Sequence, residues 1–415
     1  MADNGTILVV GGGISGLTVA LEAAEVGREV VIVERNPYLG GRVAQLNKYF
    51  PKLCPPTCGL EINFQRIKKN KKITYYTMTE VEKISGGPGD FQVSLKEMPR
   101  YVNEHCTVCA KCEEACDMDI PNEFNFGMNN RKAIYKPSEM AMPMRYVIDK
   151  SVTGTAFQQK IQDSCPYGAI DFSMQPRTFN IDVASIVWAT GWNPYDASKI
   201  DNLGFGKVPN VITNMMMERM ASPGGPTGGS IVRPSDGKQV NSIAFVQCAG
   251  SRDENHLPYC SYVCCLASMK QTTYIREKNP ESKATIFYID LRSPGRYENF
   301  YKKVKDDENV SFVKGKVAKV EPGSDGNVIL TVEDTVGGDI ISQEFEMVVL
   351  ATGMEPSTAS ERVPGGSVGY DENKFLLPGG DIIPAGVAKK PADVMTSGQI
   401  STAAALKAIQ AAGAK

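Results

Sequence analysis

The chain has 415 residues, of which 42% are hydrophobic and 22% are charged, and its net charge at pH 7 is −2. This length allows two or three compact units, and the nearly neutral charge argues against nucleic acid or an anionic membrane as a binding partner. We expect a cytoplasmic protein without a transmembrane segment, because no run approaches roughly eighteen apolar residues and the N-terminus lacks a basic and apolar leader. Eleven cysteines in such a chain indicate metal or redox chemistry rather than disulfides.

Residues 6–34 have the pattern of a dinucleotide-binding unit. A buried-strand run at 6–10 leads into a glycine-rich turn, a helical run follows, and a second strand ends at an acid. The three spaced glycines allow a tight turn, close approach of a pyrophosphate and close helix–strand packing. The helix N-terminus supplies amide donors, and the acid stands where a ribose hydroxyl is bound. The pattern predicts nucleotide binding by Gly11, Gly13, Ile14, Ser15, Gly16 and Glu34.

The segment that follows Glu34 favours FAD over NAD. It contains Arg35 and then Gly40-Gly41-Arg42, which resembles the Gly-Gly-Arg segment of FAD enzymes. We expect Arg35 and Gly41 near the cofactor, and Arg42 as a planar donor to its pyrophosphate. A glycine turn with a surface arginine is the alternative.

Cys54 and Cys58 follow, separated by two prolines and a threonine, in a spacing that matches no common metal pair. A redox dithiol near the flavin, a packing pair and a single site residue all stay open.

Four further cysteines have the spacing C-x2-C-x2-C-x3-C at Cys106, Cys109, Cys112 and Cys116. In bacterial ferredoxins the first three cysteines of this run share one [4Fe-4S] cluster and the fourth serves another. The missing ligand is then expected from a remote Cys-Pro, and Cys165 precedes Pro166. We predict one [4Fe-4S] cluster on Cys106, Cys109, Cys112 and Cys165. Cys116 in place of Cys165, or a structural zinc, are the alternatives.

Two Ala-Thr-Gly turns end buried strands at 189–191 and 351–353. In two-domain flavoproteins such turns mark the strands by which the chain passes between its two nucleotide domains. The segment around Gly386, followed by a helical run at 402–412, is expected to close over the flavin, although Val387 stands where an acid often follows the glycine. The residues expected at the cofactor are Ala189, Thr190, Gly191, Gly353 and Gly386.

The strand at 243–246 leads to Cys248, and a helix is expected from about Val263. In a two-nucleotide flavoprotein this strand-turn-helix holds the second phosphate loop. Here cysteines stand in place of the glycines, at Cys248, Cys260, Cys264 and Cys265.

These patterns predict an α/β flavoprotein with two dinucleotide-binding domains, Rossmann-type and thioredoxin-reductase-like, with an inserted ferredoxin-like iron–sulfur segment. The expected parts are 1–97 (FAD domain, first part), 98–178 (ferredoxin-like insert), 179–240 (FAD domain and crossover), 241–345 (second Rossmann-like domain with the cysteine group) and 346–415 (FAD domain, C-terminal part).

Several motifs together are similar to those of the heterodisulfide reductase A family, over nearly the whole chain. They lie at 99–102, 246–253, 258–261, 263–265 and 289–292. The resemblance implies an FAD and a second, unusual [4Fe-4S] cluster, whose C-x11-12-C-x3-C-C ligands map onto Cys248, Cys260, Cys264 and Cys265. Cofactors are thus expected to be FAD and two [4Fe-4S] clusters.

Within this family, the compact form with a single FAD resembles the A-type flavoprotein of the quinone-interacting membrane-bound oxidoreductase (Qmo) complex of sulfate-reducing bacteria. The resemblance implies electron transfer from menaquinol towards adenylylsulfate reductase, on the cytoplasmic face of the inner membrane. The implied partners are a second flavoprotein of the same family and a membrane haem and iron–sulfur subunit. The alternatives are a stand-alone NAD(P)H-dependent disulfide or polysulfide reductase and a non-catalytic redox-sensing subunit.

Overall fold

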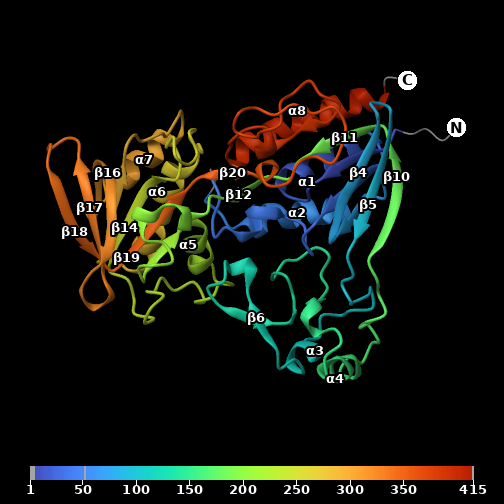
Figure 1. Ribbon diagram of the computed structural model, residues 1–415, viewed down its shortest axis with the longest axis horizontal. Coiled ribbons are helices and arrows are strands. Elements are labelled where there is room, and N and C mark those ends of the chain that lie inside the picture. Colours follow the sequence, from blue (N-terminus) through green and yellow to red (C-terminus); the bar gives the residue numbers. More distant parts are fainter. Residues whose placement is uncertain (1–4, 51–52, 414–415) are drawn as a thin grey trace.

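The first lobe is built on a parallel sheet of five strands, ordered β21-β11-β1-β2-β3 (Figure 1). The computed structural model describes residues 5–50 and 53–413. The strands are β1 (Ile7–Val10), β2 (Val30–Glu34), β3 (Ile73–Thr77), β11 (Ser185–Trp188) and β21 (Ile383–Pro384).

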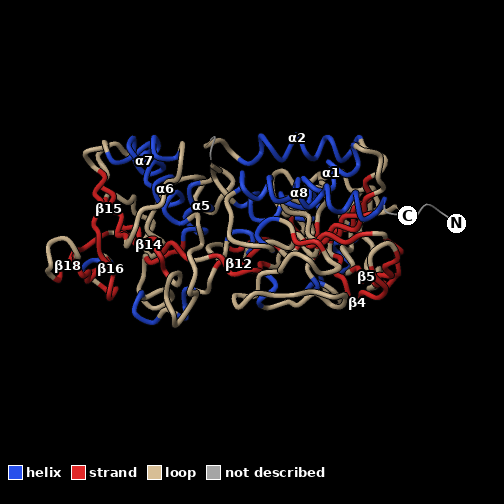
Figure 2. Tube along the Cα trace, turned by 90° about the horizontal axis from the view of Figure 1, so that it is seen from above, coloured by secondary structure: helices blue, strands red, loops and turns tan. Residues whose placement is uncertain are grey.

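Both faces of this sheet are covered, because the apolar residues of β1 alternate between two cores. Ile7 and Val9 face one core, which includes residues of α1 (Ile14–Glu25), α2 (Pro56–Lys69) and α8 (Val394–Gly413). Leu8 and Val10 face the other. That core is closed by a small antiparallel sheet of β10 (Arg177–Val183), β5 (Asp90–Glu97) and β4 (Thr79–Gly87). Figure 2 shows the helices on one side of the lobe and β4 and β5 on the other.

The second lobe repeats this plan around β14 (Ser242–Ala249), the third strand of a seven-stranded sheet. Ile243 and Phe245 face α5 (Asn214–Ala221), α6 (Cys264–Lys278) and α7 (Tyr297–Lys305), whereas Ala244 and Val246 face the opposite core. The sheet order is β13-β19-β14-β15-β16-β17-β18. The other strands are β13 (Val211–Thr213), β15 (Lys283–Tyr288), β16 (Val310–Pro322), β17 (Val328–Asp334), β18 (Ile340–Phe345) and β19 (Met347–Thr352).

Two strands lie on the other side of the expected domain boundaries. β13, expected in the 179–240 part of the FAD domain, pairs with β19 in the second sheet. β19, expected to open the C-terminal part of the FAD domain at 346, pairs with both β13 and β14. A parallel strand buried on both faces is uniformly apolar, so its sequence does not tell which of two parallel sheets it joins.

Two short antiparallel strands carry the chain between the lobes. β12 (Trp192–Pro194) leaves the first lobe directly after Ala189-Thr190-Gly191, and β20 (Met354–Pro356) returns directly after Ala351-Thr352-Gly353. The two strands pair with each other, Asn193 opposite Glu355. In Figure 1 this pair lies between the two sheets. The Ala-Thr-Gly turns therefore stand at the crossover, as the sequence indicates.

The third lobe lies between β5 and β10, which are themselves paired. It has little regular structure: α3 (Lys111–Glu114), α4 (Phe157–Asp163), β6 (Asp119–Pro121) paired with β7 (Asn130–Lys132), and β8 (Ile134–Tyr135) paired with β9 (Val147–Ile148). Its core includes cysteines beside apolar side chains. Because the strands before and after it are neighbours, this lobe is an insertion that leaves the first lobe's sheets continuous.

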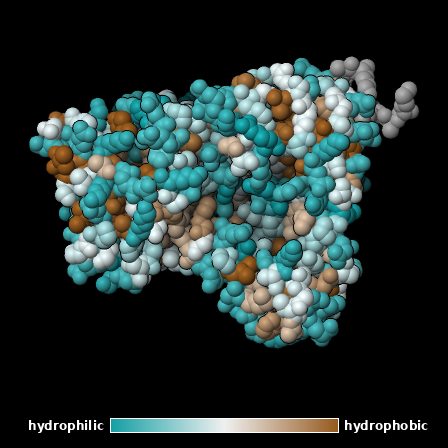
Figure 3. Space-filling view, viewed as in Figure 1, coloured by the Kyte–Doolittle hydropathy of each residue, from teal (hydrophilic) through white to brown (hydrophobic). Residues whose placement is uncertain are grey.

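The face in Figure 3 is mostly hydrophilic, with hydrophobic residues in small scattered groups and a recess between the lobes. Within the described ranges, none of the helices has the length and apolarity to cross a bilayer.

The three spaced glycines of the first turn have distinct steric reasons. Gly11 has φ +106°, and a Cβ there would overlap the carbonyl of Ala189, the residue that follows β11. A Cβ on Gly16 would overlap the Gly11 carbonyl oxygen. At Gly13 the nearest atom to an added Cβ is the Gly41 Cα at 3.7 Å, so this position leaves room for a ligand. The contacts of Gly11 and Gly16 match the turn and packing roles predicted from the sequence, and the approach of a pyrophosphate at Gly13 stays a prediction.

We predict that Gly16→Ala destabilises the protein by about 1–3 kcal/mol, because the backbone oxygen of Gly11 cannot rotate away from the added methyl group. Gly398→Ala in α8 is the matched control. No atom lies within 4 Å of its added Cβ, and alanine favours a helix over glycine by about 1 kcal/mol. Denaturant unfolding followed by circular dichroism compares the two variants, and a Gly16→Ala protein as stable as wild type contradicts the packing role.

Candidate functional site

A cavity of about 780 Å³ extends from the glycine-rich turn of the first lobe to α5 and α6 of the second. Its volume falls within the roughly 300–1,000 Å³ of small-molecule and cofactor sites. Most of the predicted cofactor residues line it: Gly11, Gly13, Ile14, Ser15, Glu34, Arg35, Gly41, Arg42, Ala189, Thr190 and Gly191. The three segments in which they lie, 11–15, 34–42 and 189–191, are brought together by the neighbouring strands β1, β2 and β11.

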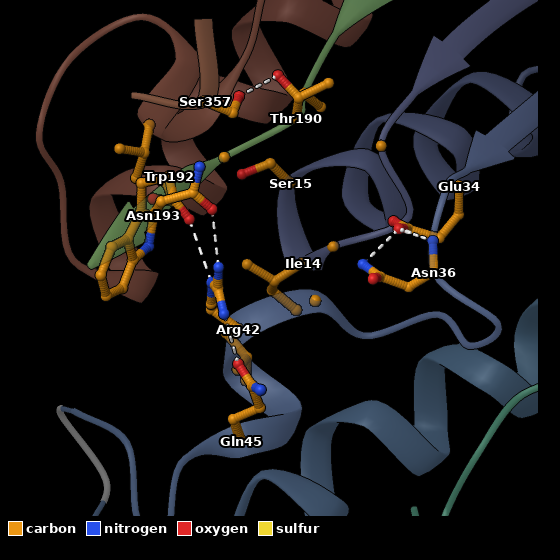
Figure 4. A pocket seen from close by; sticks show the side chains of 18 of the residues that line it. Ile14, Ser15, Glu34, Asn36, Arg42, Gln45, Thr190, Trp192, Asn193 and Ser357 are labelled. Atoms are coloured by element: carbon orange, nitrogen blue, oxygen red, sulfur yellow. Dashed lines mark hydrogen bonds between the residues drawn. The ribbon is translucent and has the colours of Figure 1, made fainter. Parts of the chain in front are cut away.

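Glu34 stands at one end of this cavity and fixes the turn. Its Oε2 accepts the Gly12 amide at 2.7 Å, and its Oε1 accepts the amide and the side-chain nitrogen of Asn36, each at 2.8 Å. Burial raises the pKa of Glu34, and these hydrogen bonds act in the opposite direction. Figure 4 shows Glu34 and Asn36 beside the turn, where an acceptor for a ribose hydroxyl is expected.

The Arg42 side chain lines the cavity and reaches the crossover strand β12. Its Nε donates to the Trp192 carbonyl at 3.2 Å and its Nη2 to the Asn193 side chain at 2.8 Å (Figure 4). Its Nη1 donates to the Gln45 side chain at 3.1 Å. Burial lowers the pKa of this guanidinium. Arg42 thus holds β12 against the first lobe and presents positive charge to the cavity.

Three predicted cofactor residues do not line the cavity. Gly16 packs beneath the turn, as described above. Gly386 has φ +57° and lies against Ser15, and its neighbour Val387 lines the cavity instead. Gly353 lies against Ser251 and Ser261, two residues of the cysteine-bearing segment. Gly353 therefore supports the cysteine group, because the crossover directs this turn towards the second lobe.

A buried charged network on the cavity wall was not predicted from the sequence, in which α5 has the pattern of an apolar core helix. Glu218 on α5 pairs with Lys270 on α6 at 3.0 Å, and their side chains are only 2% and 5% exposed. The carboxylate also accepts from Gln271 at 2.7 Å, from the Tyr274 hydroxyl at 3.0 Å and from the Asn47 amide at 3.0 Å. The sequence did contain one signal of this network: Glu218 stands among methionines, and a charged residue on a buried helix needs a hydrogen-bonding or oppositely charged partner.

Four predicted cysteines of the third lobe surround one small cavity. Cys106, Cys109, Cys112 and Cys165 line it together with Tyr146 and Tyr167. Cys116 does not. It is 1% exposed, and its thiol donates to the Met118 carbonyl at 3.6 Å. Burial, with the nearby Cys106 and Cys165, raises the pKa of Cys112 to about 12. Deprotonation of four thiols around one small cavity would require a cation, so this donor set fits a [4Fe-4S] cluster and favours Cys165 over Cys116.

The second cysteine group joins the end of β14 to the start of α6. Cys248 is the penultimate residue of β14 and has φ +57°, while Cys264 and Cys265 form the first turn of α6. Cys260 lies between them in the sequence. Burial, then the neighbouring Cys265, raises the pKa of Cys248 to about 11. Burial and the other three thiols also raise the pKa of Cys264.

The end of β14 and the start of α6 thus gather these cysteines in one region, an arrangement that fits a cluster as their common partner. Among the residues that the structure describes, no three His, Cys, Asp or Glu side chains converge as around a single ion. A cubane takes one thiolate at each of four iron atoms, so its ligands need not converge on one point.

We predict that Glu218→Gln destabilises the protein by about 3–5 kcal/mol, because it leaves the buried Lys270 ammonium without a counter-charge. The control is Glu277→Gln on α6, whose partner Lys48 lies at 2.7 Å and whose side chain is 58% exposed. That change is expected to cost about 0–1 kcal/mol. Thermal unfolding of both variants gives the comparison, and equal losses contradict the buried-pair assignment.

Comparison with known proteins supports the fold and indicates a family. Residues 9–64 match the family model of the NAD(P)-binding Rossmann-like domain. Thioredoxin reductase of Lactococcus lactis aligns with 99% of both chains at a TM-score of 0.53 and 11% identity. The T. acidophilum enzyme aligns with 97% of both chains at a TM-score of 0.52 and 12% identity. The predicted Rossmann-type, thioredoxin-reductase-like α/β fold is thereby confirmed.

Similarity in sequence is much higher to a different group. An A-type iron–sulfur subunit of CoB–CoM heterodisulfide reductase from Methanopyrus kandleri is 40% identical over 85% of this chain and 54% of its own length. The A-type subunit of the H2:CoB–CoM heterodisulfide, ferredoxin reductase from Methanothermobacter thermautotrophicus is 34% identical over 94% of this chain and 59% of its own length. The chain thus spans little more than half of these relatives. At 34–40% identity over most of its residues, the chain is related to the heterodisulfide reductase A family.

Proposed function

We propose that this chain is an FAD and iron–sulfur electron-transfer subunit of a multisubunit oxidoreductase. The observation that carries the proposal is the position of α6. Val263, Leu266 and Ala267 line the large cavity, and Cys264 and Cys265 occupy the same helical turn. A cofactor in this cavity and a cluster on these thiols are therefore neighbours across one helix turn.

Bound FAD supplies the exchange between two-electron and one-electron chemistry. The protein's part is to hold it. Gly13 leaves space at the pyrophosphate, Glu34 offers a carboxylate to the ribose, and Arg42 offers positive charge. Val263 and Leu266 are apolar and line the cavity next to Cys264 and Cys265 in the chain.

The clusters are proposed as single-electron carriers. One is held by Cys248, Cys260, Cys264 and Cys265, and the other by Cys106, Cys109, Cys112 and Cys165. Cys109 and Tyr167 are exposed, so the site in the third lobe lies near the surface, where an electron can pass to or from a partner protein.

The finer assignment rests on the sequence resemblance. We propose a complex that links menaquinol oxidation to adenylylsulfate reductase, with this chain peripheral on the cytoplasmic face of the inner membrane. The proposed partners are a second flavoprotein of the family and a membrane haem and iron–sulfur subunit. The test is reduction of the bound flavin by a menaquinol analogue, which is expected only when the membrane partner is present.

A second candidate function is a stand-alone disulfide reductase that uses Cys54 and Cys58. Tyr49 lines the large cavity. The pKa of the Tyr49 hydroxyl is raised to about 12, mainly by its hydrogen bond with Cys54. This route needs a hydride donor, whereas the second Rossmann-like lobe carries cysteines where a phosphate loop is expected. Rapid bleaching of the flavin of the isolated chain by NADH or NADPH would favour this candidate over the relay.

We predict about eight irons and eight sulfides per FAD in anaerobically purified protein, the content of two cubanes. Cys264→Ser is expected to lower the iron content to about four while the flavin stays bound, because Cys264 does not line the large cavity. Metal analysis and the flavin spectrum measure both quantities. Wild-type protein without iron rules out the relay.

We predict that Cys165→Ser removes about four irons, whereas Cys116→Ser leaves the iron content unchanged. The thiol of Cys116 donates to the Met118 carbonyl rather than facing the cavity, and a serine hydroxyl can make the same bond. Iron and sulfide analysis of the two variants decides the fourth ligand. Iron loss in Cys116→Ser alone would assign that role to Cys116.

A further inference from the structure

Arg252 connects two of the four thiols in the second cysteine group. Its guanidinium lies beside the Cys248 sulfur and forms an ion pair with Asp290 at 2.8 Å. The backbone carbonyl of the same Asp290 accepts the Cys265 thiol at 3.5 Å. Asp290 follows β15, and Arg252 follows β14, so two adjacent parallel strands deliver this arrangement at their carboxyl ends.

The backbone directs Arg252 back towards Cys248. Both residues have φ +57°, an uncommon value for non-glycine residues. The Ser251 amide donates to the Cys248 carbonyl at 3.1 Å and closes the turn between them. The Arg252 amide donates to the Tyr259 carbonyl at 3.0 Å, next to Cys260. Such strained positions persist only where surrounding contacts hold them, and they gather at functional sites.

The other charged groups nearby do not duplicate this contact. Lys316 pairs with Asp253 at 3.4 Å, and its side chain is 66% exposed. Arg292 approaches Cys265, to which its backbone amide is hydrogen-bonded. The Arg252 side chain is only 25% exposed, while that of Asp290 is 51% exposed. The positive member of the pair is therefore the more buried.

We propose that Arg252 is a positioning residue that holds Cys248 and raises the reduction potential of the cluster on Cys248, Cys260, Cys264 and Cys265. This inference rests on the proposed electron-transfer function. Reduction adds one negative charge to the cluster and its thiolates. Hydrogen bonds to cluster sulfurs and the net charge around them set the potential, and a guanidinium contributes both. It stabilises the reduced state more than the oxidised state.

The test is a potentiometric titration of the whole protein, anaerobic and followed by electron paramagnetic resonance. Arg252→Gln is expected to shift the potential of this cluster to a more negative value. Arg252→Lys, which keeps the charge but loses the planar fork, is expected to shift it less and in the same direction. Lys316→Gln is the control, since it removes one positive charge near the loop without a sulfur contact, and it is expected to cause no shift.

The ferredoxin-type cluster of the third lobe is the internal reference, and its potential is expected to stay constant in all variants. Unchanged potentials, or equal shifts in both clusters, overturn the role of Arg252. Loss of the cluster from both Arg252 variants, with the cluster intact in Lys316→Gln, also overturns the role, because Arg252 would then be required only for assembly of the cluster. Wild-type protein that carries no cluster on Cys248, Cys260, Cys264 and Cys265 instead rejects the proposed function itself, so the two failures are distinguishable.

Discussion

Burial of both faces of the two main sheets is the constraint on which the rest of the structure depends. β1 and β14 each alternate their side chains between two cores, so neither strand has a free face for a ligand. Chemistry is confined to the carboxyl ends of the strands, where the chain must turn. At β1 this turn carries Gly11 and Gly13, and at β14 it carries Cys248. The same position thus carries glycines in the first lobe and a cysteine in the second.

The geometry between these two turns is fixed by buried charge. The carboxylate of Glu218 accepts the amide of Asn47 from the first lobe and the ammonium of Lys270 from the second. Lys270 also donates to the Lys48 carbonyl. Separation of the lobes at this contact would leave buried polar and charged groups without partners, which costs free energy of folding. The distance between the large cavity and the thiols is therefore held by the protein rather than by the cofactor.

Local motifs were the part of this site that the sequence could predict. The glycine spacing, the Gly-Gly-Arg segment and the Ala-Thr-Gly turns each specify a backbone shape within a few residues, and their positions at the cavity or the crossover follow. Gly353 and Gly386 were expected at the cofactor, but their neighbours are Ser251 and Ser15, because contacts between remote segments decide which side of a turn faces the cavity. The Glu218–Lys270 pair joins two helices and has no local signature. Likewise, spacing alone left Cys116 and Cys165 as rivals, whereas in the fold it is Cys165 that lines the small cavity with the other three thiols.

The docking of α8 on α1 has a consequence for how the protein forms. Thr402 on α8 donates to Glu22 on α1 at 2.7 Å, across 380 residues of sequence. The two other lobes are both inserted between these partners. The first nucleotide domain therefore begins synthesis early but completes its core only after α8 leaves the ribosome, while the lobe around β14 has its strands and helices already made. Because pairings this distant fold slowly and domains generally fold as units, the first lobe is expected to mature after the lobe around β14.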